Sequence, residues 1–552
     1  MSSNRKMGEV KMMFTYSRKR NWTSAAQRSV VMGTQEMVAS SQPLATLAGY
    51  KILSRGGNAV DAAVAMVSTL SVVEPYSAGI GGDAFALIYL AKEDKLIGIN
   101  ASGRAPYRAD RKWFAEKGIH KIPERGILTV TVPGALHGWA QALERFGKLE
   151  LSDVFEDAIF YAKNGYPVTE VIAGEWKSVE KLLLSNEGAA QTYLIDGKAP
   201  QPGQIFRNQD LANTYKKIVR DGIELFYEGE VCDAIVNYSN REDGLLSRQD
   251  FKDHKTKWVD PISTGYRGYT VYELPPNGQG LTALEMLNIL KKYDIENLKP
   301  NGSDYLHLLI EAKKAAFSDR DHFITDPDFE KIPVDQLLSE NHAQKIRERI
   351  DLNRALPPPI VSSNPRSSET VYVTAVDKDR NAVSLISSVY LFFGSGLVVD
   401  GTGIVLQNRG KSFSLDPNHF NRLEPHKQPM HTIIPGMVFK DGKFLMSFGV
   451  MGGDMQPQGH VQFLVNLVDF KMNLQEAIDA PRVRHLQGMD VYLEDGISET
   501  VGFELSQKGH RIVKEIPLTN QVGGGQAIYL DPEQDVLLGA SDRRKDGCAL
   551  GC

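Results

Sequence analysis

The chain has 552 residues, of which 42% are hydrophobic, 24% charged and 9% aromatic. This composition is ordinary for a globular protein, and it excludes a disordered tail protein, a collagen-like fibre and a small disulfide-stapled scaffold. The formal net charge of -5 gives no reason to expect a nucleic-acid partner. At ~150 residues per domain, the length allows three or four small domains or one large folded unit.

The three cysteines are Cys232, Cys548 and Cys552. So small and odd a number is not a disulfide framework, and it suits a reducing compartment. Cys548 and Cys552 could form a bridge or bind a metal weakly, or could simply belong to a C-terminal strand. No apolar run approaches the ~18 residues of a membrane helix, and the basic, polar residues 1–30 lack the apolar stretch of a secretory signal. We expect residues 1–30 to be a loosely ordered leader and the protein to be cytoplasmic, with no membrane partner.

The first predicted elements are two helices and two strands. Residue patterns predict helices over 43–54 and 58–73, and strands near 84–91 and 95–101. The segment 58–73 is apolar on almost every face, so it should be a buried helix, with Asn58 as its N-cap after two glycines. A glycine-rich turn over 73–83 leads from this helix to the first strand.

Residues 105–350 are predicted to be mostly helical, and a linker follows them. The clearest helices are 134–146, 151–164, 280–293 and 303–318, with short strands near 258–274. Residues 351–369 contain four prolines and four serines. Because proline lacks the N–H of a strand ladder and serine favours turns, we expect an exposed linker.

Beyond the linker, the pattern becomes a mixture of strands and helices. Strands are expected over 370–377 and 382–389, a hairpin over 436–449, and helices over 457–470 and 473–480, followed by weaker strands. Strands and helices come in blocks rather than in regular alternation. This order favours a layered α+β sandwich over a doubly wound parallel sheet.

The common catalytic and metal motifs are absent from the sequence. There is no G-x-x-x-x-G-K-[ST], H-E-x-x-H, C-x-x-C or G-x-S-x-G. The closest histidine pair, His426 and His431, has the spacing of no common metal site, so we interpret it as structural. The glycine runs 79–82, 452–453 and 523–525 could each cradle an anion through backbone N–H groups, or could be tight turns.

Thr370 draws attention because it opens a strand directly after a linker. Threonine is a weak nucleophile unless a nearby base takes its proton, and a free α-amine on the same residue, with a pKa of about 8, suits that role. The amine is free only if the Glu369–Thr370 bond is cut, and the linker would then let the severed end move away. Threonine also opens many ordinary strands, so this pattern needs support from the rest of the chain.

That support comes from an ordered set of motifs that resembles the γ-glutamyltranspeptidase family of N-terminal-nucleophile hydrolases. The motifs run in the family's order over roughly residues 35–550. They are G-G-N-A-V-D-A-A-V (56–64), V-E-P (73–75), G-I-G-G (79–82), E-A-K-K-A-A-F-S-D-R (311–320), T-V-Y-V-T-A-V-D-K-D (370–379), N-A-V (381–383), F-G-S-G (393–396), G-I-V-L-Q-N (403–408), P-M-H-T-I-I-P (429–435), M-G-G (451–453) and A-P-R (480–482).

The resemblance implies a fold and a mode of maturation. The family builds a four-layer αββα sandwich and is made as a precursor that cuts itself before its nucleophilic threonine, a position that Thr370 matches. The chain would then consist of a large subunit over 31–369 and a small subunit over 370–552. The two would stay together as a heterodimer, which could dimerise further. The chemistry would need no cofactor and no metal.

The resemblance also implies roles for residues around the nucleophile. Two adjacent glycine N–H groups stabilise the oxyanion in the family, and they match Gly452 and Gly453. Ser388 matches a hydroxyl residue that assists the amine of the nucleophile, although relatives carry threonine there.

The residues with which the family binds the glutamyl α-carboxylate and α-amino groups are changed in this sequence. The carboxylate-binding arginine is replaced by Ser102, with Arg104 two residues on, and its helper serines are His431 and Thr432. The acidic residue that would hold the α-amino group is Ser412, and its amide helpers are Tyr390 and Arg409.

The altered grip favours a substrate that carries a carboxylate but no α-amino group. An ammonium next to Arg409 without a carboxylate partner is electrostatically unfavourable, whereas Arg104, Arg409 and His431 could hold a carboxylate. Either arginine could instead lie in a structural ion pair, and Tyr390 could simply fill the glutamyl pocket.

Three functions remain open at this point. The first is a self-processing amidohydrolase for a small carboxylate-bearing amide, as in the oxamate amidohydrolase, cephalosporin acylase and γ-glutamyltransferase-like branches that the chain resembles. The second is a γ-glutamyl hydrolase or transferase acting on glutathione, and the third is an unprocessed, inactive binding or scaffold protein. Residues 413–428 are short where many relatives carry a lid, which favours hydrolysis over transfer.

Overall fold

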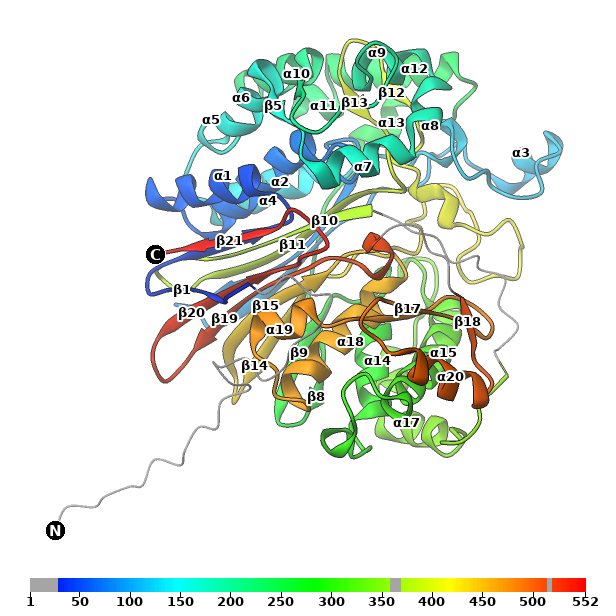
Figure 1. Ribbon diagram of the computed structural model, residues 1–552. Helices are drawn as coiled ribbons and strands as arrows, with labels where there is room; N and C mark the ends of the chain where they lie inside the picture. Colours follow the sequence, from blue (N-terminus) through cyan, green and yellow to red (C-terminus); the bar gives the residue numbers. More distant parts are fainter. Residues whose placement is uncertain (1–27, 358–368, 514–518) are drawn as a thin grey trace.

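The computed structural model describes residues 28–357, 369–513 and 519–552, in which two seven-stranded sheets are stacked between two layers of helices (Figure 1). The strand order of the first sheet is β21 (Cys548–Gly551), β2 (Met37–Ser40), β10 (Glu369–Val376), β11 (Ala382–Tyr390), β3 (Asp83–Leu90), β4 (Lys95–Ala101) and β7 (Lys257–Val259). That of the second is β1 (Val31–Gly33), β20 (Val536–Ser541), β19 (Gly525–Asp531), β15 (Lys443–Val450), β14 (Gly436–Lys440), β9 (Tyr269–Glu273) and β8 (Ile262–Tyr266). Neighbouring strands within these two sheets are antiparallel.

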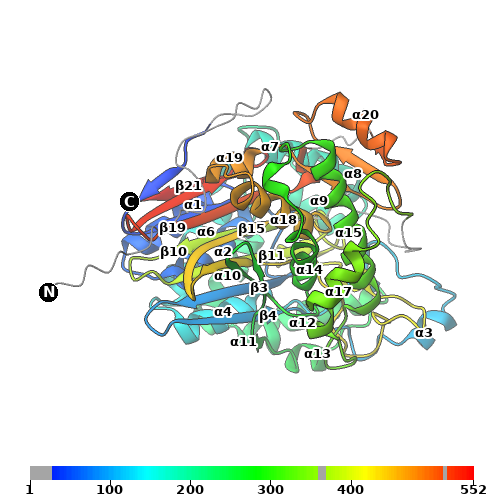
Figure 2. The same cartoon turned by 90° about the horizontal axis from the view of Figure 1, so that it is seen from below.

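One helical layer covers the outer face of the first sheet, and a second layer covers the other sheet (Figures 1 and 2). The first layer and its extension comprise α1 (Pro43–Ser54), α2 (Ala59–Val73), α3 (Arg111–Glu116), α4 (Ala135–Phe146), α5 (Leu151–Val154), α6 (Glu156–Asn164), α7 (Glu170–Ser178), α8 (Glu180–Leu184), α9 (Glu187–Tyr193), α10 (Gln209–Asp221), α11 (Glu224–Tyr227), α12 (Glu230–Arg241) and α13 (Arg248–Lys252). The second comprises α14 (Gly280–Leu290), α15 (Ser303–Phe323), α16 (Val334–Leu337), α17 (Glu340–Arg347), α18 (Met455–Val468), α19 (Leu474–Asp479) and α20 (Glu499–Gln507). Small sheets join β5 (Tyr166–Pro167) to β6 (Ile205–Phe206), β12 (Val398–Val399) to β13 (Ile404–Val405), and β16 (Val483–His485) to β17 (Asp490–Leu493) and β18 (Arg511–Val513).

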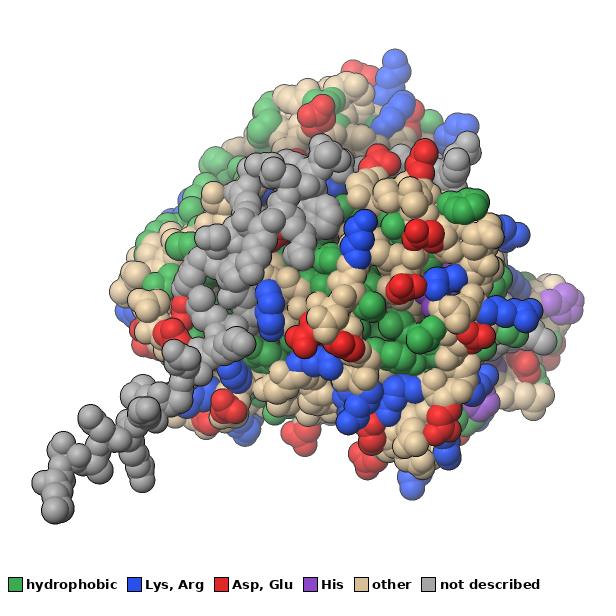
Figure 3. Space-filling view, turned by 60° about the horizontal axis from the view of Figure 1, so that its bottom comes forward, with side chains coloured by type: hydrophobic (Ala, Val, Ile, Leu, Met, Phe, Trp, Pro, Cys, Tyr) green, Lys and Arg blue, Asp and Glu red, His purple; other side chains and the backbone are tan. Residues whose placement is uncertain are grey.

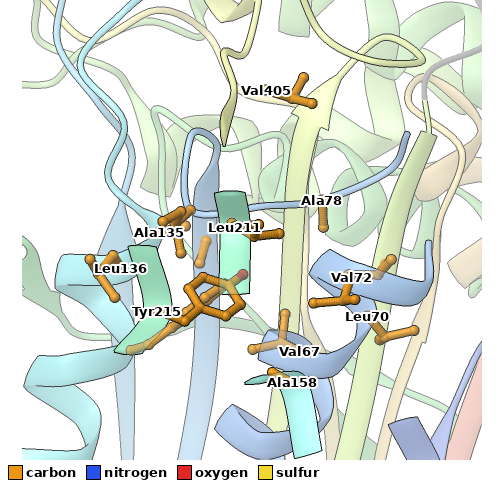
Figure 4. Close-up of a cluster of buried hydrophobic side chains, with 14 of the residues drawn as sticks. Val67, Leu70, Val72, Ala78, Ala135, Leu136, Ala158, Leu211, Tyr215 and Val405 are labelled. Carbon is orange, nitrogen blue, oxygen red and sulfur yellow. The ribbon is translucent and has the colours of Figure 1, made fainter. Parts of the chain in front are cut away.

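Apolar side chains fill each interface between the layers. Between the two sheets, Leu87 and Tyr372 meet Met437 and Ile528. Because side chains alternate along a strand, Val371 on β10 points the other way, into the cluster that α2 forms with α4, α6 and α10. Figure 4 shows part of this second cluster, in which side chains from α2 and α10 converge. The predicted αββα sandwich is therefore confirmed.

The buried helix α2 follows directly from its sequence. Each of its residues is buried, and Asn58 caps it by accepting hydrogen bonds from the backbone N–H groups of Val60 and Asp61. The Asp61 side chain accepts from the N–H of Asn58 in return, which completes a capping box. The predicted boundaries of this helix and of the helix over 43–54 are confirmed within a residue.

Three helix predictions need correction. The segment 151–164 forms two helices, α5 and α6, because the chain breaks at Phe155, whose side chain is fully buried and packs edge-on against Tyr215. The helix expected over 280–293 ends at Leu290, and the one expected over 303–318 continues to Phe323. The short strands, hairpins and later helices are found near their predicted positions.

The predicted leader and linker lie mostly outside the described residues. Of the leader, only 28–30 are described, and Arg28 donates to the carbonyl oxygens of Ser541 and Gly547 at 2.8 Å. Of the linker, residues 358–368 are not described, while Leu356 is held by the side chains of Glu311 and Lys314. The beginning of the linker is therefore attached to α15.

The cysteines, the surface charges and the lengths of the helices were the remaining expectations from the sequence. Cys548 lies in β21, and all three cysteines are free thiols, so the possible bridge between Cys548 and Cys552 is not formed. On the face drawn in Figure 3, acidic and basic side chains are interspersed. Within residues 28–357, 369–513 and 519–552, no helix is long and apolar enough to cross a lipid bilayer.

Candidate active site

Thr370 is the second residue of β10, an interior strand of the first sheet between β2 and β11, and it is completely buried. Its Oγ1 donates to Ser388 Oγ on β11 at 3.3 Å. The pairing of the two strands shifts between Glu369 and Val371, so β11 has one extra residue beside Thr370. Such bulges are frequent next to active sites because they redirect a side chain. The structure thus brings the predicted nucleophile and its predicted helper together.

The opposing sheet places a loop in front of Thr370. Thr374 Oγ1 hydrogen-bonds Ser447 Oγ across the sheet interface, and Tyr372 packs so closely on Gly449 that an added Cβ would lie 2.4 Å from its ring. From the first pair to the second, the residue number falls by two on β10 and rises by two on β15, because every second side chain of a strand points to the same face. Extended by one more step, this pattern predicts that Thr370 faces the turn that follows β15.

That turn contains Gly452 and Gly453, with φ angles of 118° and 60°. Residues other than glycine rarely adopt a φ of 118°, and an added Cβ on Gly452 would lie 3.1 Å from Gly523 Cα. Among the described residues, neither N–H group of the two glycines has a hydrogen-bond acceptor. Two unpaired donors on one turn are the arrangement that stabilises an oxyanion.

Gln279, at the N-terminus of α14, holds this turn in place. Its Nε2 donates to Gly453 O at 3.0 Å and to Thr432 O at 2.7 Å. Its Oε1 accepts from Arg320 Nη1 at 2.9 Å, and Arg320 also pairs with Asp454 at 2.7 Å. The turn is thereby tied to both α14 and α15. Gln279 was not predicted as a site residue, because a single glutamine in a loop matches no motif.

Asp83, the first residue of β3, connects the nucleophile's strand to the substrate-binding candidates. It pairs with Ser388 across the sheet. Its Oδ1 accepts from Gln407 Nε2, and its Oδ2 accepts from His431 Nε2, each at 3.0 Å. Burial, with a further contribution from Arg409, lowers the pKa of His431 to about 4. His431 is therefore neutral at pH 7 and acts as a donor to Asp83.

The turn 79–82 serves close packing. An added Cβ would lie 2.0 Å from Val405 O at Gly81 and 2.5 Å from Ser388 O at Gly82. Gly82 N–H donates to Gly79 O at 3.0 Å. This run is therefore the tight turn of the two alternatives, and its glycines let the chain approach β11.

Arg409 is completely buried and stacks beneath Tyr390, with its Cζ 3.9 Å from the ring centroid. Its Nη1 donates to Thr432 Oγ1 at 2.9 Å, whereas Nε and Nη2 have no partner in the described part of the chain. Burial lowers the pKa of Arg409 to about 10, which still leaves a cation at pH 7. No carboxylate forms an ion pair with it within 28–357, 369–513 and 519–552, and two of its three nitrogen atoms have no acceptor there.

Arg104 behaves differently from Arg409. Its Nη1 lies 2.8 Å from Asp326 Oδ2 and its Nη2 lies 2.6 Å from Asp328 Oδ2. Arg104 therefore lies in a structural ion pair, and its N–H donors are already engaged. Ser102, the residue expected in place of the family's arginine, is buried and accepts from Asn277 Nδ2 at 3.0 Å. The closest histidine pair is also explained, because His426 stacks on Tyr107 with the ring centroids 4.2 Å apart.

A cavity of about 490 Å³ adjoins the site. Tyr390 and Asp454 border it on the side of the nucleophile, and Lys411 and Ser412 line it further out. The Ser412 Oγ has no hydrogen-bond partner in the described residues. Several residues of the short segment 413–428 form another wall, so this segment shapes the cavity although it is short.

The comparisons with known proteins agree with this arrangement. The sequence model described as Gamma-glutamyltranspeptidase matches residues 45–552. The chain belongs to the γ-glutamyltranspeptidase family. Members of this family are N-terminal-nucleophile hydrolases, and the resemblance noted in the sequence is confirmed.

Individual members of the γ-glutamyltranspeptidase family are similar over almost their whole length. The glutathione hydrolase-like YwrD proenzyme of Bacillus subtilis is 40% identical over 94% of this chain and 99% of its own. The oxamate amidohydrolase proenzyme of Klebsiella pneumoniae is 34% identical over the same shares. The crystal structure of cephalosporin acylase from Bacillus halodurans matches with a TM-score of 0.91 and 41% identity, over 97% of this chain and 99% of that one.

Proposed function

We propose that the protein is a self-processing amidohydrolase whose nucleophile is Thr370. The observation that carries the proposal is the position of Thr370, buried at the start of β10 beside Ser388 and facing a turn with unpaired N–H groups. Thr370 Oγ would attack the carbonyl carbon of Glu369, and the peptide would become an ester. Water would then hydrolyse the ester and release the α-amine of Thr370. The products are the large subunit, 31–369 with any leader, and the small subunit, 370–552.

In the processed enzyme, Thr370 would supply both nucleophile and base. Its α-amine takes the Oγ proton as Oγ attacks the substrate amide, and then gives that proton to the leaving amine. Ser388, already within hydrogen-bond distance, would keep the hydroxyl oriented. Water would finally hydrolyse the acyl-enzyme. This chemistry is complete within one residue and uses no cofactor.

The negative charge of the tetrahedral intermediate would be held by the N–H groups of Gly452 and Gly453. Donors that are fixed before the reaction need no rearrangement as the charge develops, and each is worth ~3–4 kcal/mol in the barrier. Gln279 supports this role because it binds Gly453 O and so restrains the direction of the turn.

The substrate we propose is a small amide that carries a carboxylate. Arg409 supports this assignment because it is a buried cation without a carboxylate partner among the described residues. Tyr390 separates it from the cavity and has a φ of 80°, which is uncommon for a residue other than glycine. Rotation of the Tyr390 side chain would expose the guanidinium to the cavity. His431 and Thr432 would help to position Arg409 and would not bind the substrate themselves.

A γ-glutamyl hydrolase or transferase acting on glutathione is the second candidate. The observation in its favour is Asp416, an exposed carboxylate that lines the cavity and could hold an α-ammonium group. Ser412, in contrast, offers only a hydroxyl at the position of the family's acidic residue. Hydrolysis is favoured over transfer because residues 413–428 are too short to enclose the cavity against water.

Kinetics on matched substrates distinguish the two candidates. A glutaryl amide and a γ-glutamyl amide differ only in the α-amino group. The first proposal predicts a higher kcat/KM for the glutaryl amide, and a loss of more than about 10-fold for Arg409→Met on that substrate, since a charge-assisted hydrogen bond contributes ~1.5–3 kcal/mol. A preference for the γ-glutamyl amide that disappears in Asp416→Asn would reverse the assignment.

Processing is tested with Thr370→Ala. The wild type should give fragments of 369 and 183 residues on a denaturing gel, and sequencing of the smaller one should begin at Thr370. Thr370→Ala should stay whole and inactive, while Thr374→Ala, a change on the same strand, should still mature. A wild-type protein that remains one band after long incubation would instead support an inactive scaffold.

A further inference from the structure

Three metal-ligating side chains from three helices meet in the second helical layer, outside the cavity. They are Glu285 on α14, Asp319 on α15 and His342 on α17. One nitrogen or oxygen atom from each lies within 4.8 Å of the others. His342 Nε2 is 3.2 Å from Glu285 Oε1 and 2.8 Å from Asp319 Oδ2. The three helices lie side by side in both Figures 1 and 2.

In the described part of the chain, no lysine or arginine pairs with the two carboxylates of this cluster, Glu285 and Asp319. His342 is the partner of both, and it carries a charge only in its protonated form. Glu285 is buried, with only 2% of its side chain exposed. A buried carboxylate next to a second one is costly unless a proton or a cation compensates the charge. A bound metal ion is one cation that would compensate both carboxylates.

We propose that Glu285, Asp319 and His342 form a binding site for a divalent transition-metal ion, for which Zn²⁺ is the best match. Two carboxylates and a neutral imidazole carry the charge that balances such an ion. Zinc–ligand bonds of ~2.0–2.2 Å in a tetrahedral site place neighbouring ligand atoms ~3.3–3.6 Å apart. The observed separations of 2.8 and 3.2 Å therefore have to widen by less than ~1 Å, which changes of side-chain rotation can supply.

The surroundings also suit an exchangeable metal with an incomplete protein shell. Side-chain exposures of 22% for His342 and 21% for Asp319 give the ion a path from solvent and leave room for water ligands. An imidazole ligand favours zinc, cobalt or nickel over magnesium, which prefers oxygen ligands and retains its water. The ion would fasten α17 to the pair α14 and α15.

A second cluster, formed by His307, Glu311 and His510, is a weaker candidate. Lys314 Nζ lies 2.7 Å from Glu311 Oε1, so an ammonium already compensates that carboxylate. His307 Nδ1 and His510 Nε2 hydrogen-bond each other at 2.9 Å. A metal would have to displace both interactions, whereas no lysine or arginine of the described residues pairs with Glu285 or Asp319.

The test is binding of Zn²⁺ to purified protein that has been treated with a chelator and dialysed. Calorimetry should give one equivalent of Zn²⁺ with micromolar or tighter affinity, and an increase in Tm. His342→Ala and Asp319→Asn should each weaken binding by more than about 100-fold. His322→Ala, which removes an exposed histidine from the same helix α15, should leave binding unchanged.

Two results would overturn the proposal. One is less than a tenth of an equivalent bound at millimolar Zn²⁺ by wild-type protein with a normal circular dichroism spectrum. The other is binding that survives in both His342→Ala and Asp319→Asn, or that disappears in His510→Gln instead. Asp319→Asn carries the test if His342→Ala does not fold, because Asp319 is partly exposed. Bound Co²⁺ provides a direct signature, since its visible absorption should be present in the wild type and absent from both variants.

Discussion

Replacement of Gln279 by methionine should separate the orientation of the Gly452–Gly453 turn from the stability of the fold. Methionine has a similar length but no amide, so Gly453 O and Thr432 O each lose their donor. A buried polar group without a partner costs about 1–3 kcal/mol, so the two together give about 2–6 kcal/mol of lost stability. Arg320 keeps its carboxylate partner, Asp454, which limits the damage on that side.

The effect on catalysis should exceed what the stability loss alone explains. If the turn moves by a fraction of an ångström, its N–H groups no longer point at the oxyanion, and kcat should fall about 10–100-fold with little change in KM. Self-cleavage should slow in parallel, because it passes through the same kind of intermediate. Both rates would be measured at a temperature at which the variant is fully folded.

Gln475→Met provides the matched control. Gln475 is also buried, and it bonds the backbone N–H and carbonyl of Ser541 at 3.2 and 2.8 Å, away from the glycine turn. It should lose similar stability and keep kcat. Our reasoning would be refuted if Gln279→Met lost stability like the control but kept the wild-type kcat and processing rate.

The remaining predictions concern the support of the site. Gly82→Ala should lower the free energy of unfolding by about 1–3 kcal/mol, because its Cβ would lie 2.5 Å from Ser388 O. Gly79→Ala should be tolerated, because its Cβ would meet no atom nearer than 4.0 Å. Equal urea midpoints for the two variants would contradict this. The pKa of His431 is about 4 in the folded protein, against an ordinary value of 6.5. As the pH falls from about 6.5 to about 4, the unfolded chain therefore binds a proton that the folded protein does not, and the folded protein loses stability. The difference in stability slope between the wild type and His431→Gln should therefore reach up to ~1.4 kcal/mol per pH unit in that window, and parallel pH profiles would show that His431 is not the group responsible.

Local patterns predicted the fold well where neighbours in the sequence determine the structure. The cap at Asn58, the apolar faces of α2 and the strand that begins near Thr370 depend on adjacent residues. The break at Phe155 depends on Tyr215, which is distant in the sequence, so the helical pattern of 151–164 concealed it. Similarly, nothing in the sequence distinguishes a helix that ends at Leu290 from one that ends three residues later.

The candidate site was only partly predictable for the same reason. Thr370 and Ser388 were found through motifs, and the structure places them in contact. Asp83 and His431 are 348 residues apart, and their hydrogen bond follows from the stacking of β3 against a distant loop. Arg104 and Arg409 looked equivalent as sequence, and only the neighbouring Asp326 shows that Arg104 is engaged elsewhere.

The strand order has a consequence for a chain cut between residues 369 and 370. In the first sheet, β21 and β10 both pair with β2, and β11 pairs with β3, while in the second sheet β14 pairs with β9 and β20 pairs with β1. Either piece would therefore have to break five backbone ladders to depart, and its exposed strand edges would then be able to pair with strands of other molecules. A nicked molecule should melt in a single transition, and its halves should neither exchange between molecules nor reassemble readily when produced apart.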